Sequence, residues 1–152
     1  MLRAPHSKSP GLAAGVTENL IRELVQAFYA KVRRDEALGP IFNAKVDDWE
    51  HHLDKLCTFW SSVTLMTGSY KGSPMKVHAR VPGISHALFD RWLSLFRDTA
   101  LDLCPPEAAK LFIDRAERVA ESLKLGIAIH RGESVVPDLA RKPLISAGTD
   151  CP

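Results

Sequence analysis

The sequence predicts an all-α protein with one folded domain. Every periodic segment repeats its apolar residues at the 3.6-residue spacing of a helix, and none alternates as a half-buried strand does. The chain has 152 residues, of which 45% are hydrophobic and 25% are charged. That length supports one core and is too short for two full-sized ones. We therefore expect one domain over residues 17–130 and one functional site.

The first helix is predicted to begin after an irregular start. Residues 1–16 contain Pro and Gly and show no periodic apolar pattern, so we expect a flexible N-terminal arm there. Thr17 then suits the N-cap position and Glu18 the first helical turn. Apolar residues recur at helical spacing as far as Val32, and the predicted helix ends near Arg34.

A second long helix is expected after a short break. The Gly-Pro pair at residues 39–40 interrupts the chain, and Ile41 and Phe42 are expected to form a short apolar plug between helices. Asp47 and Asp48 supply an N-terminal cap for the second long helix, because a side-chain oxygen there can accept from the free N–H groups of the first turn. Its apolar positions run from Trp49 to Leu65, and the Thr-Gly pair at residues 67–68 ends it.

A turn-rich connector separates this helix from the last two. The Ser-Pro pair at residues 73–74 is typical of a helix start, so a short helix is expected there, and it carries His78. A Val-Pro-Gly break precedes a third long helix over residues 85–103, and a Pro-Pro pair opens a fourth that reaches about residue 125. Residues 131–152 are expected to be a flexible C-terminal tail.

Charge and composition exclude several kinds of partner. The formal net charge is +2 and basic residues are interspersed with acidic ones, so the chain lacks the dense basic face that nucleic acid requires. No apolar run approaches the roughly 18 residues of a membrane span, and no secretory signal pattern occurs at the start. We therefore expect a cytoplasmic protein that contacts no membrane. Three cysteines without a CxxC pair fit reduced thiols and not a structural zinc site.

Two neighbouring histidines on the second long helix face different ways. At about 100° per residue, His52 shares a face with Leu56 and Phe59, whereas His51 points toward the polar side. A histidine on an apolar face fits either a hydrogen-bonded core residue or a ligand. This helix alone leaves both roles open.

Trp92 and Tyr29 raise the same question on the third and first helices. Trp92 shares an apolar face with Leu88 and Leu95, and Tyr29 lies near the edge of the first helix's apolar face. Packing in the hydrophobic core is one explanation for each of these two rings. A buried indole N–H or phenol O–H still needs a hydrogen-bond partner, so both are candidate polar groups of a site.

His78 differs from these residues because it lies on a short segment between turns, where packing gives little reason for a histidine. It is too far along the chain from His52 for the local HxxxH spacing of a helix-borne zinc pair. Two histidines from two helical elements can instead lie above and below a flat cofactor.

A series of motifs gives the chain a resemblance to a known family. They are FYxKVRxDxxLGPIF at residues 28–42, WxxH at 49–52, FW at 59–60, GxYxGxPxxxH at 68–78, FxxWLxLF at 89–96 and RA at 115–116. In order and spacing they resemble the group III truncated haemoglobins over residues 18–125. The Gly-Gly pairs of the other two groups of truncated haemoglobins are absent.

The resemblance implies a truncated globin fold, which is a two-over-two helical sandwich around a haem. It implies that His78 is the proximal iron ligand and that Phe42 packs on the haem face. Tyr29, His52 and Trp92 would line the distal ligand pocket. The implied cofactor is haem b with its iron, held without thioether bonds because the chain has no CxxCH motif.

The resemblance also implies binding of O₂, CO, NO and other small ligands at the haem iron. One alternative is a haem-dependent detoxification enzyme, either nitric oxide dioxygenase-like or peroxidase-like, which would need a reductase that the sequence does not identify. A haem-based sensor or interaction protein is a third class. The sequence sets no oligomeric state, and it leaves open whether His52 gates the pocket, bonds the ligand or coordinates iron.

Overall fold

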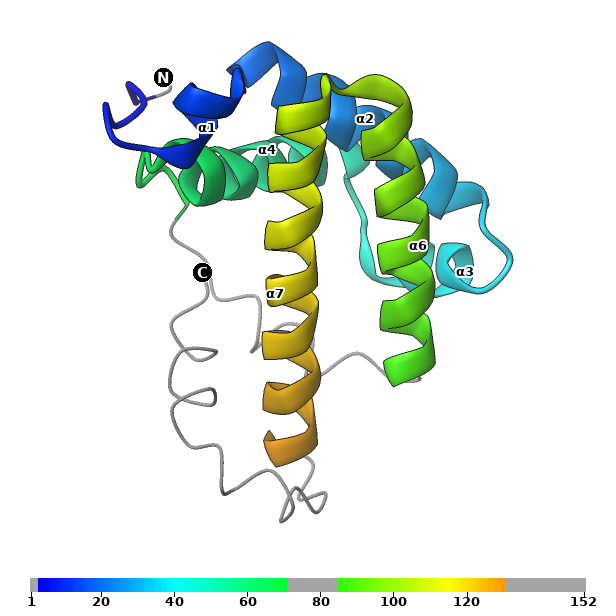
Figure 1. The fold of residues 1–152 in the computed structure, drawn as a ribbon. Helices are drawn as coiled ribbons and strands as arrows, with labels where there is room; N and C mark the ends of the chain where they lie inside the picture. Colours follow the sequence, from blue (N-terminus) through cyan, green and yellow to red (C-terminus); the bar gives the residue numbers. More distant parts are fainter. Residues whose placement is uncertain (1–2, 71–84, 131–152) are drawn as a thin grey trace.

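The computed structural model describes residues 3–70 and 85–130, and every regular element in these ranges is an α-helix (Figure 1). The helices are α1 (Pro10–Ala14), α2 (Glu18–Arg34), α3 (Leu38–Lys45), α4 (Trp49–Leu65), α6 (His86–Leu103) and α7 (Pro106–His130). No helix in this described part is long and apolar enough to cross a membrane. The expected short helix with His78, and the expected tail over residues 131–152, lie outside the described residues.

Two pairs of helices form the body of the molecule. α6 and α7 lie side by side and run antiparallel, and α2 and α4 cross one end of that pair (Figure 1). Ala108, Ala116 and Ala120 on α7 are fully buried. Small side chains at such a contact let two helix backbones approach closely. The all-α arrangement predicted from the sequence is confirmed.

An aromatic residue from each of these four helices meets at the crossing point. The Trp60 ring of α4 stacks on Phe96 of α6 with ring centroids 5.1 Å apart, and it meets Phe112 of α7 edge-on at 5.8 Å. Phe28 of α2 contacts Phe96 edge-on at 5.1 Å. All four rings are at most 2% exposed. Because aromatic pairs prefer such stacked and edge-on geometries, these contacts help to set how the two helix pairs cross.

Side chains cap the N-termini of three long helices, and two of these caps, Thr17 and Asp48, were predicted from the sequence. Thr17 Oγ1 accepts from the backbone N–H of Leu20 at 3.1 Å, and Ser85 Oγ accepts from that of Leu88 at 3.3 Å. Asp48 Oδ1 accepts from the backbone N–H of His51 at 3.2 Å, which fixes where α4 begins. These side chains satisfy N–H groups that have no partner within the helix.

The N-terminal segment differs from the expected arm. Ser9 caps α1, Pro10 takes its first position, and the backbone N–H of His6 donates to the carbonyl of Leu65 at 2.8 Å. Gly11 lies so close to α4 that a Cβ would collide with the carbonyl oxygen of Thr64. The expectation of an arm without regular structure is therefore wrong for this segment, because glycine allows the turn to dock on α4.

The expected plug between the first two long helices is itself helical. Asp35 Oδ2 accepts from the backbone N–H groups of Ala37 and Leu38 at 3.0 and 2.8 Å, which starts α3. Pro40 falls in the first turn, where its missing N–H removes no intrahelical hydrogen bond. Phe42 is therefore presented from a helix. The last helix also differs from expectation, since α7 continues to His130.

Candidate functional site

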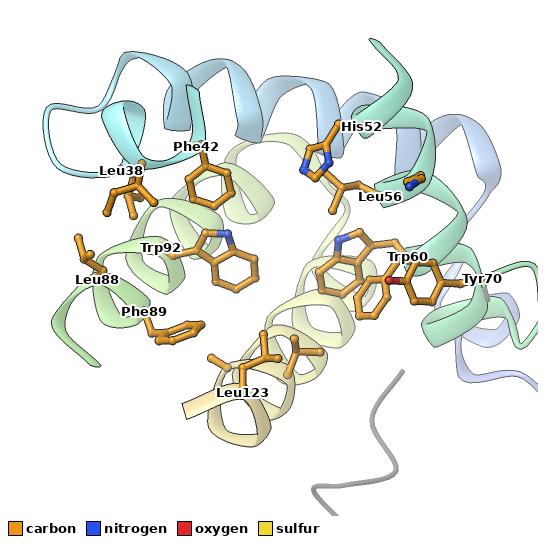
Figure 2. Close-up of a pocket in the computed structure, with 15 residues that line it drawn as sticks. Leu38, Phe42, His52, Leu56, Trp60, Tyr70, Leu88, Phe89, Trp92 and Leu123 are labelled. Atoms are coloured by element: carbon orange, nitrogen blue, oxygen red, sulfur yellow. The ribbon is translucent and has the colours of Figure 1, made fainter. Parts of the chain in front are cut away.

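A cavity of about 240 Å³ lies between α3, α4, α6 and α7 (Figure 2). A single water needs only about 15 Å³ on the same measure, so the cavity is far larger than a packing void. Most of its lining is apolar, and the polar atoms come from a few side chains, as is typical of cofactor and ligand pockets. The lining residues are Leu38, Ile41, Phe42, His52, Lys55, Leu56, Phe59, Trp60, Tyr70, Leu88, Phe89, Trp92, Val119, Ala120 and Leu123.

The α4 wall brings His52 to the cavity. His52, Leu56 and Phe59 all line it, whereas His51 is exposed and does not. Figure 2 shows the imidazole of His52 above the side chain of Leu56, pointing toward the space between the walls. The helical spacing that separates the two histidines in the sequence therefore also separates them in the structure.

Tyr29 and Trp92 form a hydrogen-bonded pair between α2 and α6. Trp92 lines the cavity and its indole N–H donates to the Tyr29 hydroxyl oxygen, since an indole can only donate. Burial raises the pKa of Tyr29 to about 12, and the bond from Trp92 opposes part of that rise. The phenol is therefore protonated near neutral pH and can accept through its oxygen while it keeps a hydrogen to donate.

Tyr29 lies behind the cavity wall and not on its surface. The side chain is only 4% exposed, and its ring meets the rings of Phe42 and His52 edge-on at centroid distances of 5.9 and 6.3 Å. Phe42 and His52 line the cavity, and Tyr29 does not. The structure thus brings the predicted residues Phe42, His52, Trp92 and Tyr29 together. Tyr29 was expected to line the pocket, but it lies behind the residues that do.

His78, the fifth predicted site residue, lies outside the described residues. Its role as an iron ligand stays a prediction. Within residues 3–70 and 85–130, no three His, Cys, Asp or Glu side chains come close enough together to hold a metal ion.

Two further lining residues were not singled out from the sequence. Lys55 follows His52 by one helical turn, so the spacing that marked His52 would also have marked Lys55. Tyr70 has a weaker signal in the sequence, because it follows the end of α4 and helical spacing no longer applies to it. Its backbone N–H donates to Ser62 Oγ at 2.8 Å, and its ring meets Phe59 edge-on at 5.2 Å, which holds it against the cavity.

Comparison with known proteins identifies the family. The bacterial-like globin family matches residues 13–123. The group 3 truncated haemoglobin Ctb of Campylobacter jejuni is 33% identical over 109 residues, which are 69% of this chain and 86% of that protein. The chain belongs to the group III truncated haemoglobins. The crystal structure of a group III truncated haemoglobin from Campylobacter jejuni matches with a TM-score of 0.69 and 32% identity, over 74% of this chain and 91% of that one.

Membership of the truncated haemoglobins implies a haem-binding globin that takes small gaseous ligands. The predicted fold and family are both confirmed. The cavity fits a haem in its chemistry, because apolar side chains from four helices suit the hydrocarbon surface of a porphyrin and a few polar groups also line it. Lys55 adds a cation that suits the acidic groups of a haem.

Proposed function

We propose that this truncated haemoglobin holds haem b without covalent attachment in the cavity and binds O₂ and other diatomic ligands there. The observation that supports this most is the Trp92–Tyr29 pair, which places a protonated phenol directly behind Trp92 at the wall of a mostly apolar cavity. His78 would be the proximal ligand, with Phe42 against the haem face. When bound, haem would supply an iron atom that takes O₂, CO or NO.

The chain's own residues would set how long a ligand stays. Hydrogen-bond donors stabilise a ligand that gathers negative charge, and O₂ does so more than CO. The Tyr29 oxygen accepts the one indole N–H of Trp92, so the Tyr29 hydroxyl hydrogen is the donor of this pair that is left for a ligand. Such a bond contributes about 1 kcal/mol or somewhat more, so it would slow O₂ release several-fold. The arrangement favours retention of O₂ over its delivery.

An absorption spectrum of the purified chain tests the proposal directly. We expect a Soret band that shifts on reduction and shifts again with CO. His78→Ala should lose stable haem attachment, because neutral imidazole would no longer hold the iron. His51→Ala is the matched control, since His51 is exposed and its loss should leave the spectrum nearly unchanged. No Soret band after haem reconstitution, or a normal spectrum in His78→Ala, would overturn the proposal.

A further inference from the structure

Phe96 is a buried residue of α6 whose ring stacks on two tryptophans of the candidate site. Its ring centroid lies 5.6 Å from that of Trp92 with planes 13° apart, and 5.1 Å from that of Trp60 with planes 16° apart. Both tryptophans line the cavity (Figure 2), whereas Phe96 does not and is 1% exposed. Near-parallel, offset rings are a favoured geometry for aromatic pairs. Phe96 therefore supports two wall residues from within the core.

The ring plane of Trp92 is set by its neighbours. The torsion that joins an aromatic ring to its Cβ atom has broad minima, so packing decides how the ring is turned. Phe96 lies against the Trp92 indole, and Phe28 of α2 meets the indole edge-on at 5.3 Å and 83°. The planes of Phe28 and Phe96 are themselves 84° apart. Two nearly perpendicular rings thus restrict the indole in two directions.

The plane of the indole determines where its single N–H points. In the observed orientation that N–H donates to the hydroxyl oxygen of Tyr29. The N–H bond lies in the ring plane and hydrogen bonds weaken steeply when they bend, so turning the ring would break this bond. Phe28 also meets the Tyr29 ring edge-on at 4.7 Å and 71°. The two phenylalanines therefore hold both partners of the bond.

We propose that Phe96 is a positioning residue that fixes the plane of the Trp92 indole, so that the indole N–H stays on the Tyr29 oxygen and the phenol hydrogen is left for a bound ligand. The inference rests on the proposed function, in which that hydrogen is the donor for O₂. A hydroxyl whose oxygen accepts a hydrogen bond keeps its own hydrogen turned away from the donor. A loosened indole would let the hydroxyl rotate, and O₂ would lose a directed donor.

Phe96→Leu tests the proposal, and Phe112→Leu of α7 is the matched control. Both phenylalanines are at most 1% exposed, and both contact the ring of Trp60. Among the ring contacts within residues 3–70 and 85–130, Phe112 has one with Trp60 and none with Trp92. Both changes should lower the melting temperature, but only Phe96→Leu should loosen the Trp92 indole. Phe96→Met, which keeps most of the volume without a flat ring face, replaces Phe96→Leu if that variant takes up no haem.

Hydrogen exchange of the Trp92 indole N–H, followed by NMR of the diamagnetic CO form, is a readout that does not depend on ligand kinetics. We expect exchange to be about two- to tenfold faster in Phe96→Leu than in the wild-type protein, which is what the loss of an aromatic pair allows. In Phe112→Leu the exchange rate should stay at the wild-type value. An unprotected indole in the wild-type protein, or equal exchange rates in all three proteins, would overturn the inference.

Stopped-flow measurement of O₂ release checks the consequence for the ligand. Phe96→Leu should speed O₂ release by about twofold or more, and should speed CO release less. In a Trp92→Phe background the same change should have little further effect, because Phe96 acts through the indole N–H that this background lacks. Equal acceleration in both backgrounds, or the same acceleration in Phe112→Leu, would show that Phe96 acts through general packing and would overturn the inference. A wild-type chain that takes up no haem would instead sink the proposed function.

Discussion

Tyr29 is held under the cavity wall in its protonated form, so replacing it with Phe removes one hydroxyl and little volume. We expect Tyr29→Phe to speed O₂ dissociation several-fold, which corresponds to losing about 1–2 kcal/mol of hydrogen bonding. Because burial raises the pKa of Tyr29 to about 12, the wild-type rate should not change through this group between pH 6 and pH 10. Stopped-flow measurement of O₂ release at several pH values checks both expectations.

The comparison with CO separates hydrogen bonding from altered access. CO gathers less negative charge than O₂, so its dissociation should respond more weakly to the loss of the hydroxyl. Trp92→Phe is a second probe, and the double variant should be non-additive, because the indole and the phenol are bonded to each other. Equal effects on O₂ and CO would show that Tyr29 acts through packing and not through its hydroxyl.

At the scale of helices, Asp35 joins three elements with one carboxylate. It follows α2, accepts from the first N–H groups of α3, and pairs with Arg91 of α6 at 2.7 Å. Asp35→Ala should lower the free energy of unfolding by about 1–2 kcal/mol, the usual cost of losing a helix cap. Arg91→Ala should lower it by less, since half of the arginine side chain is exposed. Urea denaturation of both variants measures the difference.

The Asp35 contribution should also depend on pH. The hydrogen bond from Arg91 lowers the pKa of Asp35 from 3.8 to about 2, against the opposing effect of burial and with help from the backbone N–H groups of Leu38 and Ala37. A carboxyl with a lowered folded-state pKa stabilises the fold fully above its unfolded pKa and loses that contribution as pH falls. The difference in the free energy of unfolding between wild type and Asp35→Ala should therefore stay constant from pH 7 to pH 5 and narrow below pH 4. A gap that widens below pH 4 would contradict this assignment.

Long helices could be predicted from the sequence because caps and apolar spacing mark them locally. Thr17 and Asp48 are such signals, and each forms its expected bond, while Ser85 caps α6 in the same way. The two short helices were missed. Ser9 and Pro10 are a local signal for the start of α1, but the helix is too short for apolar spacing to show, and tertiary contacts help to decide both helices. α1 depends on the close approach of Gly11 to α4, and the start of α3 depends on a carboxylate that Arg91 also holds. Neither contact has a signature in the adjacent sequence.

At the scale of the whole molecule, the site exists because two helix pairs cross. Helical spacing predicted that His52 and Trp92 face inward, and the family resemblance supplied Phe42 and Tyr29. The bond between Tyr29 and Trp92 could not be predicted, because it depends on the angle at which α2 and α6 meet. The contacts of Trp49 could not be predicted either, because its neighbours come from α2, α3 and its own helix.

We expect the docked N-terminal segment to contribute to the stability of the whole chain. Removing residues 1–15 would take away α1 and uncover Leu65 and Thr64, which are fully buried in the intact chain. Exposing one buried aliphatic side chain costs about 1.5–3 kcal/mol, which should lower the melting temperature by roughly 3–12 °C in a domain of this size. Thermal unfolding followed by circular dichroism of the haem protein measures the shift. Removal of residues 133–152 is the comparison, and from their sequence we expect that variant to melt like the full chain. If the N-terminal truncation also melts like the full chain, α1 contributes nothing to stability and its contacts with α4 are incidental.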